Sequence, residues 1–467
     1  GNFNVLHPGH LRLLRFAKEC GHFLIVGVNS DRISGNSAHV SEDLRMEGVK
    51  SNSWVDRVIL IDDSVSDVLV KLKPDFVVKG KEHQNRFNPE EKILESHGGK
   101  LLFSSGETTF SSLELLHKEF SNLTYKDISL PSEYMSRHSI SNEKLRKLIK
   151  KFSSLKVCVI GDLIIDEYIT CEPLGMSQED PTIVVTPIDT TRFIGGAGIV
   201  ATHASGLGSE VEFVTILGRD EVGIYGKDAL NKAGVKAHCI VDESRPSTIK
   251  QRFRSKGKSL LRVSHLHQNA IDTLLQDKVF SIVESIIKET HLLVFSDFNY
   301  GCLPQNLVDR LKTLAKTHNV MLAADSQSSS QIGDISRFLD FDLITPTERE
   351  ARISVKNNED GLVILAEKLK KQSLASNIFL KIGEEGLLVH SGDKSSGSHT
   401  DRIFALNSAP RDVAGAGDSL LISGALTLAC GGNIWEAAVI GSLAAAIQVG
   451  RVGNTQLKSE ELLQEVM

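Results

Sequence analysis

Two short motifs near opposite ends of the chain carry residue types suited to phosphate chemistry. One is His7-Pro8-Gly9-His10, and the other is Asp412-Val413-Ala414-Gly415-Ala416-Gly417-Asp418. The first joins two imidazoles to a tight turn, which suits holding a nucleoside triphosphate while a phosphate attacks its inner phosphorus. The second joins a loop of small residues to a carboxylate, which suits transfer of a terminal phosphoryl group to a hydroxyl. The two motifs therefore predict two different phosphate-transfer sites.

The N-terminal motif is expected to open a helix. Pro8 fixes the turn, Gly9 lets the backbone approach a phosphate, and residues 11–20 predict the helix that follows. Backbone N–H groups and the positive end of the helix dipole would then face the phosphates. His7 and His10 would donate to the triphosphate and stabilise the charge that develops as pyrophosphate leaves. Four residues alone also fit a chance loop, and that alternative stays open.

The C-terminal motif predicts an anion hole followed by a general base. Gly415, Ala416 and Gly417 precede a predicted helix, so their N–H groups would form a nest for an anion. Asp418 at the helix start would accept the proton of a sugar hydroxyl as that hydroxyl attacks the γ-phosphate of ATP. Tight packing of small residues is the alternative, and the specific order of the string favours catalysis.

Composition limits the classes to which the chain can belong. Its 467 residues suggest two or three domains. A net charge of −6 and a pI near 6.3 argue against a nucleic-acid partner. The six cysteines lack metal-ligand spacing, which fits a reducing, cytoplasmic compartment. The apolar residues 437–449 are too few to span a bilayer and predict a buried helix, so no membrane partner is expected.

Two blocks of the chain alternate strand and helix signals, which predicts an α/β fold in each. The first block covers residues 1–120, with strands at 23–28, 76–78 and 100–103. The second covers residues 155–467, with strands at 157–160, 211–215, 292–295, 320–324, 343–344 and 378–380. Most of these strands end in small or acidic residues, as expected where ligands meet the carboxyl ends of parallel strands.

The remaining segments predict a linker and a lid. Residues 121–154 are polar and contain a helix at 142–152 with apolar positions at helical spacing, expected as a solvated helix leading into the second block. Residues 182–188 and 249–263 predict extended antiparallel pieces that form a small β lid over a sugar pocket. The chain starts at Gly1, without Met and inside a motif whose preceding strand is absent, so the N-terminal strand is expected to be truncated.

Residues 1–120 resemble the cytidylyltransferase-like superfamily of glycerol-phosphate and heptose-phosphate nucleotidylyltransferases. The resemblance rests on the HxGH motif at a strand-to-helix junction, on Lys79-Gly80 after a later strand, and on the late Thr/Ser cluster. It implies that His7, His10 and Lys79 are catalytic. It also implies a nucleotide site formed by Phe3, Asn29, Asp31, Thr109, Ser111 and Ser112. Arg45 is expected either to reach phosphate or to be an exposed arginine.

Residues 155–467 resemble the ribokinase-like (pfkB) sugar kinases, whose motifs recur here in order. The resemblance implies a sugar site formed by Asp162, Asp166, Gly195, Gly196, Lys250 and Arg252. It places Lys381 and Gly383 on the ATP side and Glu350 near Mg²⁺ through water. ATP and Mg²⁺ are the implied cofactors, with a monovalent cation as a further option, and pairing of lids in a homodimer is a further option.

Within that family, the second block is most similar to the kinase half of bifunctional heptose-phosphate kinase/adenylyltransferases. The segments 177–181 and 296–298, together with Asp325, carry this similarity. It implies phosphorylation of D-glycero-D-manno-heptose 7-phosphate at O1. It further implies that the first block joins a sugar 1-phosphate to AMP, giving ADP-heptose and pyrophosphate. The two domains stand in the reverse of the usual order.

The chain departs from the kinase pattern at several positions. Ile199 and Thr347 replace asparagines, and lysines expected near Tyr300 and Gln327 are missing. Three hypotheses follow. The chain performs both reactions on this heptose, performs them on another sugar or with CTP, or contains one degenerate domain that acts as a sensor of nucleotide or sugar phosphate or as a scaffold.

Overall fold

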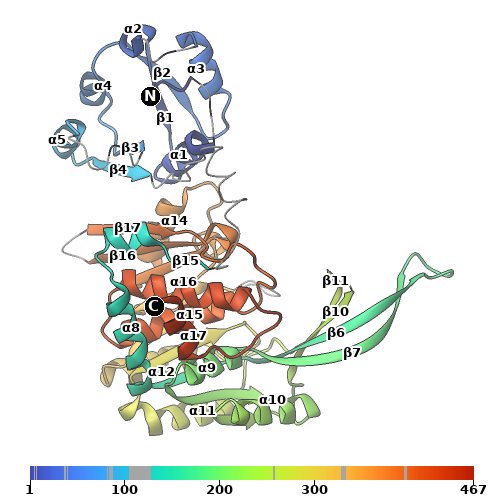
Figure 1. The fold of residues 1–467 in the computed structure, drawn as a ribbon. Helices are drawn as coiled ribbons and strands as arrows, with labels where there is room; N and C mark the ends of the chain where they lie inside the picture. The colour runs from blue at the N-terminus through green and yellow to red at the C-terminus, as the bar shows by residue number, and fades with distance from the viewer. Residues whose placement is uncertain are drawn as a thin grey trace. The chain divides into compact units, whose positions relative to one another are not determined.

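The computed structural model describes residues 1–467 except 5, 7, 36–37, 39, 81–82, 84–87, 105–127, 256–257, 328–332 and 394–396. The chain divides into two compact units (Figure 1). The first is Gly1–Tyr125 with Asn357–Leu365, and the second is Lys126–Lys356 with Ala366–Met467.

Two pairs of parallel strands lie in the described residues of the first unit. Strand β1 (Ile25–Asn29) pairs with β2 (Arg57–Ile61), and β3 (Phe76–Gly80) pairs with β4 (Lys100–Ser104). The sequence patterns predicted β1, β3 and β4 but not β2. The helices described in this unit are α1 (Pro8–Glu19), α2 (Asp31–Ser34), α3 (Glu42–Lys50), α4 (Val65–Leu72) and α5 (Glu90–Glu95).

The second unit is built on a nine-stranded sheet of order β17-β16-β15-β14-β13-β12-β5-β8-β9. Seven strands are parallel, and β16 (Leu387–Asp393) and β17 (Gly397–Ile403) are antiparallel. Both faces are covered, because neighbouring β5 residues such as Val159 and Ile160 point to opposite faces and both are fully buried. The parallel strands are β5 (Lys156–Gly161), β8 (Glu210–Leu217), β9 (Lys236–Val241), β12 (Leu292–Asp297), β13 (Met321–Ser326), β14 (Leu343–Ile344) and β15 (Asn377–Lys381).

The strand order reverses at β5. From β5 the chain continues to β8 and β9 on one side, and later strands add on the other side, starting with β12. In open α/β sheets, ligands bind at the carboxyl ends of the strands beside such a reversal. The helices that matter most for the site are α9 (Ala197–Gly206), α15 (Ala416–Ala429) and α16 (Ile434–Val449). Helix α15 packs against both α9 and α16, and all three pack against the sheet. Other helices are α10 (Glu221–Lys232), α11 (Thr273–Ile286), α12 (Gln305–Thr317), α13 (Glu348–Val355), α14 (Leu362–Ser373) and α17 (Ser459–Glu465).

The described part of the segment expected as a linker includes the α-helices α7 (Ser132–Arg137) and α8 (Asn142–Lys151). Helix α8 was predicted, but its apolar residues Leu145, Leu148 and Ile149 are buried in the core of the second unit. The amphipathic spacing therefore reflects packing against that unit, and α8 is an integral part of it rather than a solvated connection.

The lid is a separate four-stranded sheet of order β11-β10-β6-β7. Strands β6 (Leu163–Met176) and β7 (Ile183–Gly196) form a long antiparallel hairpin that extends from the unit (Figure 1). Strand β10 (Thr248–Ser255) pairs in parallel with β6 and antiparallel with β11 (Lys258–His265). The extended pieces expected at 182–188 and 249–263 are thus confirmed across their described residues, and the lid also includes β6, which follows β5 almost directly.

Two further expectations concern apolar and sulfur-containing residues. Residues 437–449 lie in the buried helix α16, as predicted. Across the part of the chain that the structure describes, no helix is long and apolar enough to cross a membrane. All six cysteines are free thiols.

Candidate active sites

The predicted anion hole forms the N-terminus of α15. Gly415 has φ 77°, and a Cβ atom added there would lie 2.4 Å from Asn454 Oδ1. A Cβ atom on Gly417 would lie 3.1 Å from Lys381 Nζ. Because the first N–H groups of a helix have no intrahelical acceptor, these donors can serve an anion. The small residues are therefore required by close approach and by a left-handed backbone.

The half-buried Asp412 and the buried Gln448 shape the loop before the anion hole. Asp412 accepts hydrogen bonds from the N–H groups of Ala414 and Gly453, each at 3.1 Å, and from the Tyr168 hydroxyl at 3.0 Å. Burial alone would raise the pKa of Asp412, but these hydrogen bonds lower it below its usual value. Gln448 Nε2 donates to the carbonyls of Ala414 at 3.3 Å and Gly453 at 3.0 Å. Asp412 and Gln448 each bond to both Ala414 and Gly453, so they hold the anion-hole loop against the 450–454 loop.

Asp418 is buried at the mouth of this hole. Gln327 Nε2 donates to its Oδ1 at 3.3 Å. The pKa of Asp418 is raised to about 7, first by burial and then by the charge of Asp325, while Lys381 opposes the shift. A carboxylate that titrates near neutral pH is well matched to accepting a hydroxyl proton.

Lys381 and Asp325 form a buried ion pair beside Gly417. Lys381 Nζ lies 2.8 Å from Asp325 Oδ2, which joins the ends of β15 and β13. Burial raises the pKa of Asp325 to about 6. Burial alone would lower the pKa of Lys381, but the charges of Asp325 and Glu350 raise it. The ammonium therefore remains charged next to the anion hole, and Gly383, with φ 61°, lies in the turn after β15.

Glu350 lies in the first turn of α13, where it completes a capping box with Thr347. Its Oε2 accepts from the Thr347 N–H at 2.7 Å, and its own N–H donates to Thr347 Oγ1. One carboxylate oxygen thus caps the helix. The predicted role of Glu350 toward Mg²⁺ stays a prediction.

The structure gives the two aspartates after β5 different surroundings. Asp162 accepts from the backbone N–H groups of Phe298, Tyr300 and Cys302 at 3.0–3.3 Å. Burial raises its pKa to about 6, and the charge of Asp297 adds to that effect. Because its oxygens hold the 298–302 loop, these contacts favour a structural role for Asp162, and its sugar contact stays a prediction.

Asp166 faces the lid cations. It lies opposite Lys250 in the β6–β10 register, and Arg252 Nη2 lies 3.7 Å from its Oδ1. Burial raises the pKa of Asp166, and the charges of Arg252 and Lys250 oppose that shift. Gly195 is required here, because an added Cβ would lie 2.3 Å from Asp166 Oδ2, and Gly196 adopts φ 59°.

A row of cations, which we call the basic strip, continues along the lid. Arg252 and Arg254 lie over the ring of Tyr168 at 5.3 and 4.9 Å, and Lys250 Nζ lies 5.2 Å from the rings of Phe298 and Tyr300. Alternate residues of a strand share a face, and Arg262 on β11 lies opposite Arg252. The basic strip consists of Lys250, Arg252, Arg254 and Arg262.

The first unit brings together part of its predicted site. His10 lies in the first turn of α1, which begins earlier than expected, and its ring centroid is 4.9 Å from that of Phe3. Lys79 Nζ donates to Asn88 Oδ1 at 2.9 Å and Glu90 Oε1 at 3.0 Å. The predicted residues His7, Thr109, Ser111 and Ser112 lie outside the described residues.

Arg45 differs from both expectations for it, because its side chain is fully buried. It donates to the carbonyls of Val40, Asn2 and Asn29 at 2.8–2.9 Å and to Asp31 Oδ1 at 2.5 Å. The Arg45 guanidinium lowers the pKa of Asp31. Asn29 Nδ2 also donates to Asn2 Oδ1 at 2.9 Å. Arg45 therefore holds the segment that carries the predicted nucleotide-site residues Asn29 and Asp31.

Three residues that shape the kinase site were not predicted from the sequence. Asp412 lies within the Asp-x-x-Gly-Ala-Gly-Asp string, so its position was a usable signal. Gln448 and Asn454 belong to no recognised pattern and reach the site only through the fold. Ile199, in contrast, is 2% exposed and offers no polar atom.

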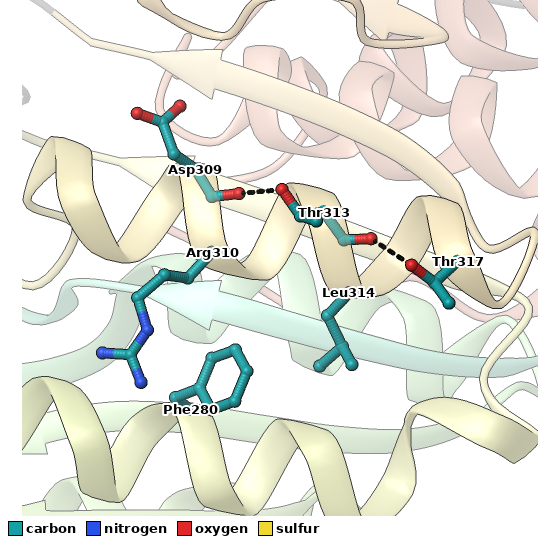
Figure 2. Close-up of a pocket in the computed structure, with 6 residues that line it drawn as sticks. All are labelled: Phe280, Asp309, Arg310, Thr313, Leu314 and Thr317. Atoms are coloured by element: carbon teal, nitrogen blue, oxygen red, sulfur yellow. Dashed lines mark hydrogen bonds between the residues drawn. The ribbon is translucent and has the colours of Figure 1, made fainter.

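A separate hollow lies between α11 and α12 (Figure 2). Arg310 lies 4.3 Å over the ring of Phe280, and the Thr313 and Thr317 hydroxyls donate to backbone carbonyls of α12. None of the predicted site residues lines this hollow.

Comparison with known proteins identifies the family of each of the two units. The chain belongs to the pfkB family of carbohydrate kinases, whose model matches residues 154–461. Residues 1–116 match the cytidylyltransferase-like family. The expected pairing of these two domains, with the kinase C-terminal, is confirmed.

Solved structures confirm the ribokinase-like fold of the kinase unit. A ribokinase from Thermotoga maritima matches with a TM-score of 0.52 and 22% identity, over 67% of this chain and 99% of that one. Phosphofructokinase-2 from Escherichia coli in complex with potassium matches with a TM-score of 0.53 and 15% identity, over 67% and 98%.

Curated proteins with similar sequences include several named Bifunctional protein HldE. The protein from a Nitratiruptor species is 29% identical over 310 residues, which cover 66% of this chain and 64% of the relative. That from Desulfatibacillum aliphaticivorans is 29% identical over 319 residues, which cover 67% and 63%. The chain therefore spans slightly less than two thirds of the length of these curated relatives. The expected resemblance to bifunctional enzymes of this kind is confirmed.

Proposed function

We propose that the chain is a bifunctional transferase acting on sugar phosphates. The kinase unit phosphorylates D-glycero-D-manno-heptose 7-phosphate at O1 with ATP. The N-terminal unit transfers AMP from ATP to a sugar 1-phosphate, giving ADP-heptose and pyrophosphate. The relatives named Bifunctional protein HldE and the two matching families support this proposal.

The observation that carries the kinase proposal is the burial of Asp418 beside an anion hole, within the electrostatic reach of Asp166 and Lys250. Lys250 and Arg252 flank Asp166 and belong to a strip of four cations. A neutral sugar gives such a strip no counter-charge, whereas a phosphate gives it charge-assisted hydrogen bonds. The arrangement therefore favours an acceptor that already carries phosphate.

The kinase chemistry follows from these groups. Asp418 takes the proton from the O1 hydroxyl as that oxygen forms a bond to the γ-phosphorus of ATP. The bond between the γ-phosphorus and the bridging oxygen breaks, and ADP leaves with the bonding electrons. Lys381 and the N–H groups of Gly415 to Gly417 stabilise the charge on the phosphoryl oxygens. Arg252 and Lys250 hold the existing phosphate of the acceptor.

The residues present fit a magnesium ion bound with ATP. Glu350 and Asp325 lie close enough for the charge of Glu350 to raise the pKa of Asp325, and carboxylate oxygens are the donors that Mg²⁺ prefers. When bound, the ion would neutralise triphosphate charge, and Glu350 would hold it through water. A monovalent cation in the kinase domain remains a further part of this proposal.

In the N-terminal unit, a sugar 1-phosphate oxygen bonds to the α-phosphorus of ATP and pyrophosphate leaves. His10 lies at the N-terminus of α1, where the helix dipole favours an anion. By family resemblance, His7 acts with it on the triphosphate, and Lys79 contacts phosphate. Asn29, Asp31 and Phe3 form the nucleotide side.

We further infer a cytoplasmic homodimer. The outer part of the β6–β7 hairpin exposes Leu174, Met176, Ile183 and Ile188, each at 58–65% of its full area. Exposed apolar side chains on an extended hairpin suit association with a second copy of the same surface.

Mass spectrometry of products tests the proposal directly. Full-length protein is incubated with MgATP and D-glycero-D-manno-heptose 7-phosphate for the kinase, and with MgATP and the heptose 1-phosphate for the transferase. We expect a bisphosphate and ADP-heptose, respectively. Asp418→Ala should abolish only the first product, and His10→Ala only the second. Loss of both products in either folded variant would refute the two-site assignment.

A different sugar is the second candidate, and the burial of the apolar Ile199 favours it. A panel of sugar phosphates, each tested with ATP and with CTP, separates this candidate from the first. Nucleotide binding without turnover on any member of the panel would instead support a sensor or scaffold.

A further inference from the structure

Three polar atoms converge at the base of the lid without hydrogen-bond partners among the described residues. They are Asp166 Oδ1, Arg252 Nε and Asn454 Oδ1, and all three are buried. Asp166 connects them, because Asn454 Nδ2 lies 3.3 Å from its Oδ2 and Arg252 Nη2 lies 3.7 Å from its Oδ1. Buried polar atoms are almost always paired in folded proteins. Their convergence therefore marks a place where a polar ligand completes the hydrogen bonding.

Asn454 occupies the junction between the two halves of the kinase site. Its side chain lies next to Gly195, on the side of Asp166, and next to Gly415, at the start of the anion hole. The loop that carries it is held firmly, because Gly453 N–H donates to Asp412 and Gly453 O accepts from Gln448. The Asn454 amide is thus presented from a fixed backbone.

The chemistry of the three atoms identifies the ligand class. Two are acceptors, the oxygens of Asp166 and Asn454, and one is a donor, Arg252 Nε. A sugar hydroxyl can donate to an amide or carboxylate oxygen, and a phosphate can accept from an arginine. A sugar phosphate therefore satisfies all three groups, whereas a simple anion would be repelled by both oxygens.

We propose that Asn454 is a specificity-determining residue that accepts a hydrogen bond from a hydroxyl of the sugar phosphate. This inference rests on the proposed function of the kinase unit. The Asn454 Nδ2 donates to Asp166 and orients its carboxylate, and the Asn454 Oδ1 accepts the hydrogen bond from the sugar hydroxyl. Since Asn454 also lies against Gly415, it sets the distance between the acceptor and the anion hole.

Equilibrium binding on the full chain tests this proposal. The probe is D-glycero-D-manno-heptose 7-phosphate, titrated calorimetrically into wild type, Asn454→Ala and Asn454→Ser, with ATP titrated separately. Asn454→Ser keeps a polar side chain on the loop, but this side chain is shorter and moves the acceptor oxygen away from the sugar phosphate. Gln456→Ala is the matched control, because that nearby amide donates to the backbone carbonyls of Thr202 and Ala233 at 2.9–3.0 Å.

We expect both Asn454 variants to bind the sugar phosphate about tenfold more weakly, equivalent to ~1.4 kcal/mol. Their affinity for ATP, and both affinities of Gln456→Ala, should stay within about twofold of wild type. Unchanged sugar-phosphate affinity in both variants would overturn the proposal. An equal loss of ATP affinity would also overturn it, because Asn454 would then only support Gly415.

The kinase function and the role of Asn454 can be tested separately. If wild type binds the sugar phosphate but forms no bisphosphate, the proposed kinase function fails while the comparison of variants still decides the role of Asn454. If wild type does not bind this sugar phosphate, both ideas fail for this substrate.

Discussion

Because Gln327 contacts Asp418, a charged substitution at Gln327 should shift the pKa of Asp418 and with it the pH dependence of kinase activity. Gln327 Nε2 lies 3.3 Å from Asp418 Oδ1, and the pKa of Asp418 is about 7 because the carboxyl is buried. A base must be deprotonated to act, so kinase activity should rise with pH through about 7 and level off above it. The substitution Gln327→Lys places an ammonium group where the neutral amide now lies.

The direction and size of the effect follow from charge. An opposite charge within about 4–6 Å favours the carboxylate and lowers its pKa by roughly 1 to 3. The midpoint of the acid limb should therefore move from about 7 to between roughly 4 and 6. At pH 6 the base form would increase from about a tenth to at least about half of the enzyme. The other charged groups that act on Asp418 are Asp325 on β13, Lys381 on β15, Asp166 on β6 and Lys250 on β10.

The assay is the pH dependence of kcat/KM for the sugar phosphate at fixed MgATP. Gln327→Met is the matched control, because it keeps the length of the side chain without a charge and should leave the midpoint near 7. The nucleotidyl-transfer profile should not move in either variant. An active Gln327→Lys enzyme with an unshifted acid limb would show that Asp418 does not control that limb.

Three further outcomes are expected. Gly415→Ala should lower kinase kcat by about a hundredfold or more, because the new Cβ meets Asn454 Oδ1 and displaces the anion-hole donors; nucleotidyl transfer serves as the internal control. Arg45→Met should destabilise the first unit by about 3 kcal/mol, because three carbonyls lose a donor worth roughly 1 kcal/mol each. Faster hydrogen exchange in β1 would register that loss, and unchanged exchange would contradict it. Leu174→Glu with Ile188→Glu should convert a dimer to monomers in sedimentation velocity, and a dimer that persists would exclude the lid as the interface.

Much of the fold follows from local patterns in the chain. Six of the seven parallel strands of the kinase sheet were placed within one or two residues, because buried parallel strands appear as short apolar runs that end in polar residues. The edge strand β9 was not predicted. The helix start that carries Gly415 and Asp418 was also predictable, since these residues lie in one continuous string. Their roles as anion hole and general base stay predictions. The first half of the long β6–β7 hairpin was missed, because β6 begins directly after β5 and no turn signal separates them.

The sequence by itself determined the class of chemistry and the residues that belong to contiguous motifs. Only the tertiary structure decided which of those residues meet and which partners they acquire. Asn454 and Asp166 are 288 positions apart, and Gln448 lies 34 positions from Ala414, so no local period links them. Likewise, packing buried Arg45 among backbone carbonyls, and it gave Asp162 backbone N–H partners while Asp166 faces the lid cations. The physical reason is that hydrogen bonding and desolvation depend on where distant segments pack, whereas local sequence constrains mainly the path of the backbone.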